Sequence, residues 1–139
     1  MLRLLSVLLI GALAFGLVLL DPVASSAAPA FAAQSSDDAG VRVVVTPMAL
    51  GPGMTIWEFE VVMDTHTKPL EEDLAQSAVL VDEAGSRYRP AAWQGDPPGG
   101  HHRKVILQFS PPAEMPKAVE LRIDGVGGAG VRTFRWRLQ

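Results

Sequence analysis

The sequence predicts an all-β protein, an immunoglobulin-like antiparallel β-sandwich of about seven strands preceded by an N-terminal hydrophobic export helix. From residue 41 onward, short segments are β-branched or alternate between apolar and polar residues, and turns rich in glycine and proline separate them. No long segment after residue 40 has the apolar period of a helix. The length of 139 residues predicts one folded domain, which we place at residues 41–139.

Residues 54–64 predict the central strand of this sandwich. Their alternation places Trp57, Phe59, Val61 and Met63 on one face, with mainly polar side chains on the other. This period-two pattern is typical of a strand with one buried face. The other predicted strands span residues 41–47, 77–82, 87–90, 103–109, 119–124 and 133–138. Between them, residues 68–76 fit either one helical turn or an irregular loop, and residues 91–102 form the longest irregular region.

The last two predicted strands form a hairpin, closed by a two-residue turn at residues 128–129. This turn pairs Ile123 with Phe134, so that both point into the core. It also places Arg122 opposite Arg135, and like charges at directly opposed positions are unfavourable. Acidic neighbours on the same face are expected to reduce that repulsion.

The first 32 residues indicate export. Arg3 precedes an uncharged apolar run at residues 4–20, and a tract of small residues follows. The A-x-A segment at residues 30–32 predicts cleavage before Ala33, with Ala28 as an alternative site. The run is also almost long enough to span a bilayer, so residues 1–32 are either a signal peptide or a retained N-terminal membrane anchor.

Both alternatives place the folded domain outside the cytoplasm, as a periplasmic, secreted or membrane-anchored protein that faces outward. Contact with the membrane is expected only through the N-terminal segment, if it is not cleaved. Residues 33–40 are small and polar, and we expect them to form a flexible linker.

Histidine enters the sequence at two places that flank predicted strands. His66 follows the central strand, and His101 and His102 precede the strand at residues 103–109. If these strands are antiparallel neighbours, His66 can approach His101 or His102, and Asp64 can join them. Imidazole and carboxylate ligands together suit zinc or copper, and no other cofactor is predicted. The alternative is that these are polar loop residues that form hydrogen bonds with the backbone.

The irregular region at residues 91–102 contains Trp93 and Asp96, which we assign as candidate contacts for a partner. One interpretation is that Trp93 folds back and closes the open end of the sandwich. The other is that Trp93 is exposed and binds a ligand or a partner protein.

Composition and motifs argue against several other functions. The formal net charge of −3 does not indicate a nucleic-acid-binding protein. The chain has no cysteine, which excludes a lipoprotein anchor and a thiol nucleophile, and it has no G-x-S-x-G motif. The acidic residues 71–73 lack the spacing of a calcium-binding loop, and the glycines at 125–130 join two strands instead of opening a helix. We therefore predict that the protein is not an enzyme.

The segments DTHT at residues 64–67 and DPPGGHHR at residues 96–103 resemble those of small exported bacterial proteins that have an immunoglobulin-like fold and no assigned activity. The resemblance implies a fold and a compartment, and no characterised family is matched. We therefore expect a non-catalytic binding module of the bacterial cell envelope whose partner is an unknown envelope protein or ligand. The alternatives are a metal-binding exported protein that uses the loop histidines, and a structural envelope accessory protein.

Overall fold

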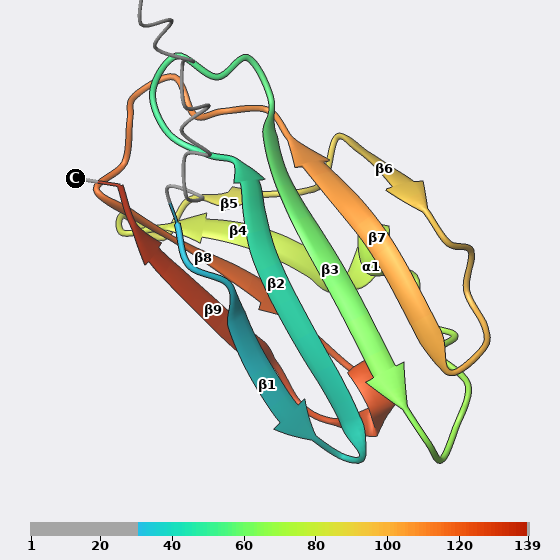
Figure 1. Ribbon diagram of the computed structural model, residues 1–139. Helices are drawn as coiled ribbons and strands as arrows, with labels where there is room; N and C mark the ends of the chain where they lie inside the picture. Colours follow the sequence, from blue (N-terminus) through green and yellow to red (C-terminus); the bar gives the residue numbers. More distant parts are fainter. Residues whose placement is uncertain (1–30, 139) are drawn as a thin grey trace, which may run out of the picture.

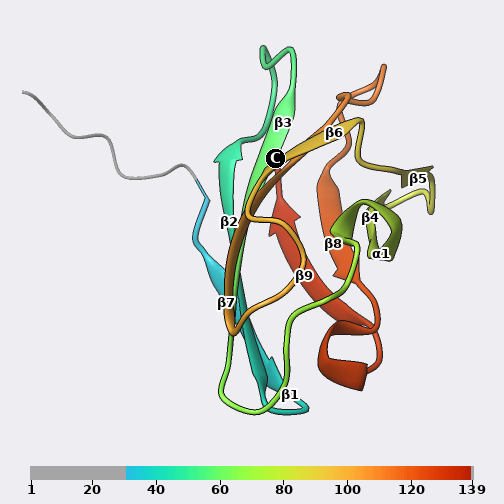
Figure 2. The same ribbon diagram turned by 90° about the vertical axis from the view of Figure 1, so that its right-hand side faces the viewer.

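The computed structural model describes residues 31–138, which form two antiparallel β-sheets packed face to face (Figures 1 and 2). One sheet has the strand order β1-β2-β3-β7-β6 and the other the order β5-β4-β8-β9. The strands are β1 Gln34–Asp38, β2 Val41–Ala49, β3 Trp57–Thr65, β4 Ala78–Asp82, β5 Arg87–Tyr88, β6 Ala92–Gly95, β7 His102–Phe109, β8 Ala118–Ile123 and β9 Arg132–Arg137. A short helix, α1 Leu74–Ser77, precedes β4, and a 3₁₀ turn, η1 Val126–Gly128, precedes β9.

The prediction of an all-β antiparallel sandwich is confirmed for this part of the chain. The predicted export helix and the alternative cleavage site at Ala28 lie outside the described residues, and the cleavage before Ala33 stays a prediction. Within residues 31–138, no helix has both the length and the apolar character needed to cross a membrane.

The core lies between the two sheets and follows the alternation of the sequence. On β3, Trp57, Phe59, Val61 and Met63 are fully buried, as predicted. Phe59 contacts Trp136 of the other sheet, with ring centroids 5.4 Å apart. Aromatic rings bury large apolar areas, so this contact between the sheets contributes stabilisation in a chain that has no disulfide.

The segment that we expected to be a flexible linker is instead largely a strand. Gln34–Asp38 forms β1, which pairs with β2 from Gln34 opposite Val45 to Asp38 opposite Val41. Its side chains are exposed or only partly buried, so no apolar alternation marks the strand in the sequence. The linker prediction for residues 34–38 is therefore wrong.

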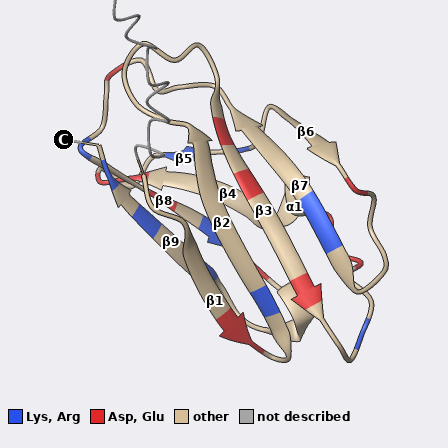
Figure 3. Ribbon diagram, in the orientation of Figure 1, with Lys and Arg blue, Asp and Glu red and all other residues tan. Residues whose placement is uncertain are grey.

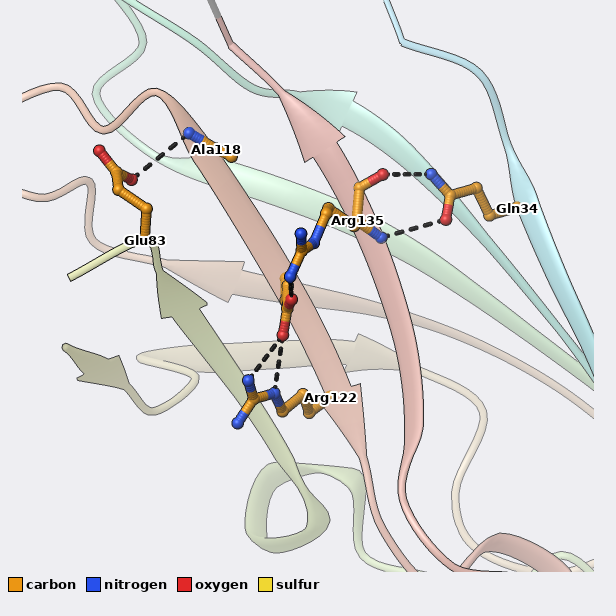
Figure 4. A network of polar contacts seen from close by, with 6 residues as sticks. Gln34, Glu83, Ala118, Arg122 and Arg135 are labelled. Atoms are coloured by element: carbon orange, nitrogen blue, oxygen red, sulfur yellow. Dashed lines mark hydrogen bonds and ion pairs between the residues drawn. The ribbon is translucent and has the colours of Figure 1, made fainter. Parts of the chain in front are cut away.

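Polar contacts with β9 hold β1 in place. The side-chain amide of Gln34 donates to the backbone carbonyl of Arg135 and accepts from the backbone N–H of the same residue, as Figure 4 shows. The buried guanidinium of Arg132 donates to the backbone oxygens of Ser36 at 3.1 Å and Asp38 at 2.8 Å. The side-chain amide of Gln34 thus pairs with both the backbone N–H and the backbone carbonyl of Arg135, at the free edge of β9.

The β8–β9 hairpin forms, but its register differs by two residues from the predicted one. Ile123 pairs with Arg132, and Phe134 pairs with Leu121. The predicted two-residue turn is wrong because η1 lengthens the connection between the strands. A shift of two residues keeps every side chain on its face, so the predicted inward positions remain inward.

The observed register also removes the unfavourable pair that we predicted. Glu120, and not Arg122, lies opposite Arg135. Its carboxylate accepts from Arg135 and from Arg122, whose Nε lies 2.9 Å from it (Figure 4). Glu120 is buried, so Arg122 and Arg135 share one carboxylate that is largely removed from water.

Part of the region predicted to be irregular forms the edge strand β6, which pairs with β7. All four residues of β6 are exposed, so the strand has no apolar pattern in the sequence. Trp93 pairs with Leu107 and thus points toward the core side of the sheet. It lies at the free edge, where 43% of it stays exposed. Trp93 is therefore an exposed residue of an edge strand, and its role as a partner contact stays a prediction.

We predict that β1 is an essential part of the fold. A chain that begins at Ala39 should be about 3 kcal/mol or more less stable than one that begins at Phe31, because the buried guanidinium of Arg132 loses acceptors on β1. Urea unfolding of the two chains measures this difference. Equal stability would instead support the flexible linker.

Candidate functional site at the loop end of the sandwich

Four connections meet at one end of the sandwich, which we call the loop end. They are the β1–β2 turn, the segment from the end of β3 to α1, the β6–β7 loop and the β8–β9 connection. Thr65 donates its backbone N–H to His101 at 2.9 Å, and Leu70 donates to Gly100 at 2.8 Å and accepts from Gly99 at 2.7 Å. The two histidine-bearing loops are therefore joined by backbone hydrogen bonds into one surface.

A buried arginine on the core side of the sheet forms hydrogen bonds with both of these loops. Arg103 is only 2% exposed and lies on the core side of β7, in phase with the other inward residues of that strand. Its guanidinium donates to the backbone oxygens of Glu72 at 2.8 Å, Leu70 at 3.4 Å and Asp96 at 3.4 Å. Burial lowers the pKa of Arg103, and the nearby carboxylates of Glu72, Asp96 and Asp73 oppose that shift.

Our sequence reasoning missed Arg103, although a signal was present. The alternation of β7 that places Val105 and Leu107 inward also places Arg103 inward. A charged residue at an inward position needs acceptors, because an unpaired buried charge is very costly. Carbonyl groups of two adjacent loops are the acceptors that this end of the sandwich provides.

A second clamp joins the segment before α1 to η1. The backbone N–H of Gly127 donates to the Glu72 carboxylate at 3.0 Å, and its carbonyl accepts from the Lys68 ammonium at 2.7 Å. Gly127 has φ of +70°, and a Cβ atom there would lie 2.6 Å from Cγ2 of Val41. Only glycine fits at position 127. There the segment before α1 binds both the backbone N–H and the backbone carbonyl of η1.

The structure brings together two of the four predicted metal ligands. Asp64 and His102 are cross-strand partners on β3 and β7, and Nδ1 of His102 lies 2.5 Å from Oδ1 of Asp64. His66 and His101 are exposed, and neither forms a side-chain hydrogen bond with this pair. Among residues 31–138, no group of three or more histidine, aspartate and glutamate side chains is placed to hold a metal ion. The zinc or copper site stays a prediction, with two adjacent ligands available to it.

The two candidate partner contacts do not lie together. Asp96 is at the loop end, where its carboxylate accepts from the backbone N–H of Lys104 at 2.9 Å and fixes the start of β7. Trp93 pairs with Leu107, near the other end of β7. Trp93 is therefore exposed outside the loop end, and Asp96 has a structural contact within it.

Negative charge is concentrated at the loop end. The acidic residues there are Asp37, Asp38, Asp64, Glu71, Glu72, Asp73, Asp96 and Asp124. They are eight of the 15 in the chain, and Figure 3 shows them at the ends of β1 and β3 and in the neighbouring loops. Among the basic residues there, Arg103 and Arg132 are buried, whereas Arg42 and Lys68 are exposed.

An open groove of about 820 Å³ crosses this acidic surface between the β1–β2 turn and the end of β3. Its lining includes Asp37, Asp38, Asp64, Arg42 and His66. A surface with this excess of carboxylates attracts cations and basic segments of other proteins.

A second open groove lies on the outer face of the sheet β5-β4-β8-β9. It is also about 820 Å³, and its lining combines arginines with carboxylates, among them Arg122 and Glu120. The lining mixes cations such as Arg87 and Arg122 with carboxylates such as Asp124, so the groove does not present charge of one sign to a ligand. It is the weaker candidate.

Comparisons with known proteins do not identify a family. No family model matches the chain, and no curated protein matches it. Among solved structures, the secreted protein MPT63 from Mycobacterium tuberculosis is similar, with a TM-score of 0.44 and 14% sequence identity. The similarity covers 76% of this chain and 92% of that chain. No characterised family is therefore matched, and no function follows from this similarity.

We predict that Arg103→Met loosens both loops. The change removes three hydrogen bonds from a charged donor and should destabilise the protein by about 2–4 kcal/mol. Hydrogen exchange at the amides of Leu70 and Gly99 should accelerate more than exchange in β8. Lys104→Met, one residue further along β7 and exposed, is the control and should leave exchange at both amides unchanged.

We also predict that Gly127→Ala destabilises the protein more than Gly128→Ala does. Both glycines have positive φ, but a Cβ atom at Gly128 meets nothing within 4 Å. The shared backbone strain costs roughly 1–2 kcal/mol, and the clash with Val41 adds roughly 1–3 kcal/mol at Gly127. Urea unfolding of the two variants measures the difference, and equal losses would contradict the close contact with Val41.

Proposed function

We propose that the protein is a non-catalytic, extracytoplasmic interaction module that binds a basic partner at the loop end. The observation that carries this proposal is the buried Arg103, which fixes two acidic loops in one arrangement. Export is supported by Arg3 and the apolar run at residues 4–20.

The rigidity of the loop end favours recognition. Loops at one end of an immunoglobulin-like sandwich commonly carry binding sites, because the sheets hold them in place. Here the loops are tied to each other, to β7 and to η1. A surface that is already ordered loses little conformational entropy when a partner binds, so more of the contact energy contributes to affinity.

The charge of the loop end indicates the chemistry of the partner. Glu71, Asp37 and Asp38 are exposed, and no side chain of the described residues donates a hydrogen bond to their carboxylates. Complementary charge accelerates association and excludes acidic partners, while salt weakens both effects. We therefore propose a protein partner with a basic surface.

The Asp64–His102 pair is the described contact that most resembles a part of a catalytic site. The ring of His102 contacts the Asp64 carboxylate, as a catalytic histidine can. However, within residues 31–138 no hydroxyl group forms a hydrogen bond with His102, and both members of the pair are about half exposed to water.

Photo-crosslinking in cells that produce the protein tests the proposal. A photoreactive amino acid at His66, within the loop end, should capture a discrete protein of basic isoelectric point. The same amino acid at Ser110, which is exposed at the other end of the sandwich, should not capture it. Equal capture at both positions, or capture of an acidic protein, would contradict the proposal.

The captured partner then allows a kinetic measurement. Replacing Asp37, Asp38 and Glu71 together by the corresponding amides should lower the association rate on the order of tenfold and weaken its dependence on salt. Glu114→Gln neutralises an exposed carboxylate at the other end and is the control. An association rate that the triple change leaves unaltered would exclude electrostatic recognition.

A further inference from the structure

We propose that the β2–β3 hairpin contacts the bilayer from which the chain emerges, with residues 48–56 resting in the lipid headgroup layer. This proposal follows the anchor alternative for residues 4–20 and is independent of which partner binds the loop end. It concerns the opposite end of the sandwich, where Figure 2 shows the hairpin projecting beyond β6 and β9.

The hairpin exposes apolar side chains that no other part of the described chain covers. Met48, Met54 and Ile56 are 56%, 47% and 46% exposed. They are three of the five large hydrophobic side chains exposed within residues 31–138; the other two are Trp93 on β6 and Val131 in the connection before β9. Such a concentration of exposed apolar side chains marks a contact with a protein or a membrane.

The same segment carries no charge. Between Arg42 on β2 and Glu58 on β3, every residue is uncharged. Protein-binding surfaces commonly have a polar or charged rim, whereas a segment that enters the headgroup layer must avoid burying charge. The composition of the hairpin therefore favours a lipid surface over a protein.

The exposed side chains are held outward by the fold. Leu50 turns back into the core, and the indole N–H of Trp57 donates to the carbonyl of Gly51 at 3.0 Å. Gly51 has φ of +112° and Gly53 has φ of +81°, which permits the tight loop between these residues. No apolar side chain has to leave the core for Met54 to meet a membrane.

The chain enters the domain at this end. Gln34, the first residue of β1, pairs with Val45 at the middle of β2, so residues 31–33 precede this midpoint. The carbonyl of Ala32 accepts from the indole of Trp136 at 2.8 Å, near the end of β9, and Phe31 packs against the core. The point where the N-terminal segment joins the sandwich is therefore fixed at the hairpin end.

The length of the preceding segment keeps the hairpin near the bilayer. Ten residues, 21–30, separate the apolar run from Phe31. Fully extended, they reach roughly 35 Å, so an anchored domain cannot move farther than that from the surface. A short tether raises the effective concentration of the hairpin at the membrane, and a few partly buried apolar side chains are then sufficient for contact.

Fluorescence of the full chain in lipid vesicles tests this proposal. The chain has no cysteine, so a single introduced cysteine can carry one environment-sensitive label, nitrobenzoxadiazole. Met54→Cys and Ile56→Cys report on the hairpin, and Glu71→Cys, exposed at the loop end, is the matched control. The vesicles contain phosphatidylcholine, phosphatidylglycerol and a nitroxide-labelled lipid that quenches the label on contact.

We expect a blue-shifted emission at both hairpin positions and quenching at least about twofold stronger than at the control position. Equal quenching at all three positions would overturn the proposal. A blue shift without quenching would also overturn it, since it indicates contact between copies of the protein. Cell fractionation with mass measurement is the second readout: a chain shortened at residues 28–32 and released from the membrane would exclude the anchored arrangement.

Discussion

The arrangement of the loop end depends on which donors form hydrogen bonds with the backbone carbonyl groups of the loops, in a sandwich that has no disulfide. Those groups lie next to the core, where an unpaired acceptor is costly. Two buried arginines provide donors: Arg103 bonds the loops that follow β3 and β6, and Arg132 bonds β1, β2 and η1. Because one guanidinium has several donors in a fixed plane, each arginine can join segments that are far apart in the sequence.

The buried half of the fold could be predicted from the sequence, because burial leaves a pattern. The central strand and its four inward residues are confirmed, as is the alternation of β7. The two edge strands at either side of the larger sheet, β1 and β6, were missed for the converse reason: they bury little, and their stability comes from backbone pairing and from polar contacts such as Gln34 with Arg135. The hairpin register failed because pattern alone does not reveal the length of a connection.

The candidate site shows the same division between local and long-range information. The sequence predicted that His66 approaches His101 or His102 and that Asp64 can join them; in the structure it is Asp64 that meets His102, because the two are cross-strand partners. His101 lies in a bend immediately before β7, so the strand pairing that places His102 beside Asp64 does not extend to it. By contrast, the contacts of Glu72 and Lys68 with Gly127 join residues more than fifty positions apart, and no spacing in the sequence indicates them.

The two ends of the sandwich differ in chemistry, and this difference relates the two proposals to each other. The hairpin at residues 48–56 is uncharged and apolar, and the chain enters the domain near it; the loop end is acidic and rigid. β3 connects them, and its nine residues span roughly 30 Å. That length exceeds the Debye length of about 8 Å at physiological ionic strength, so charges at a membrane are screened from the loop end. At this distance anionic lipid does not repel the acidic loop end. The loop end can therefore attract a basic partner while the hairpin contacts the membrane.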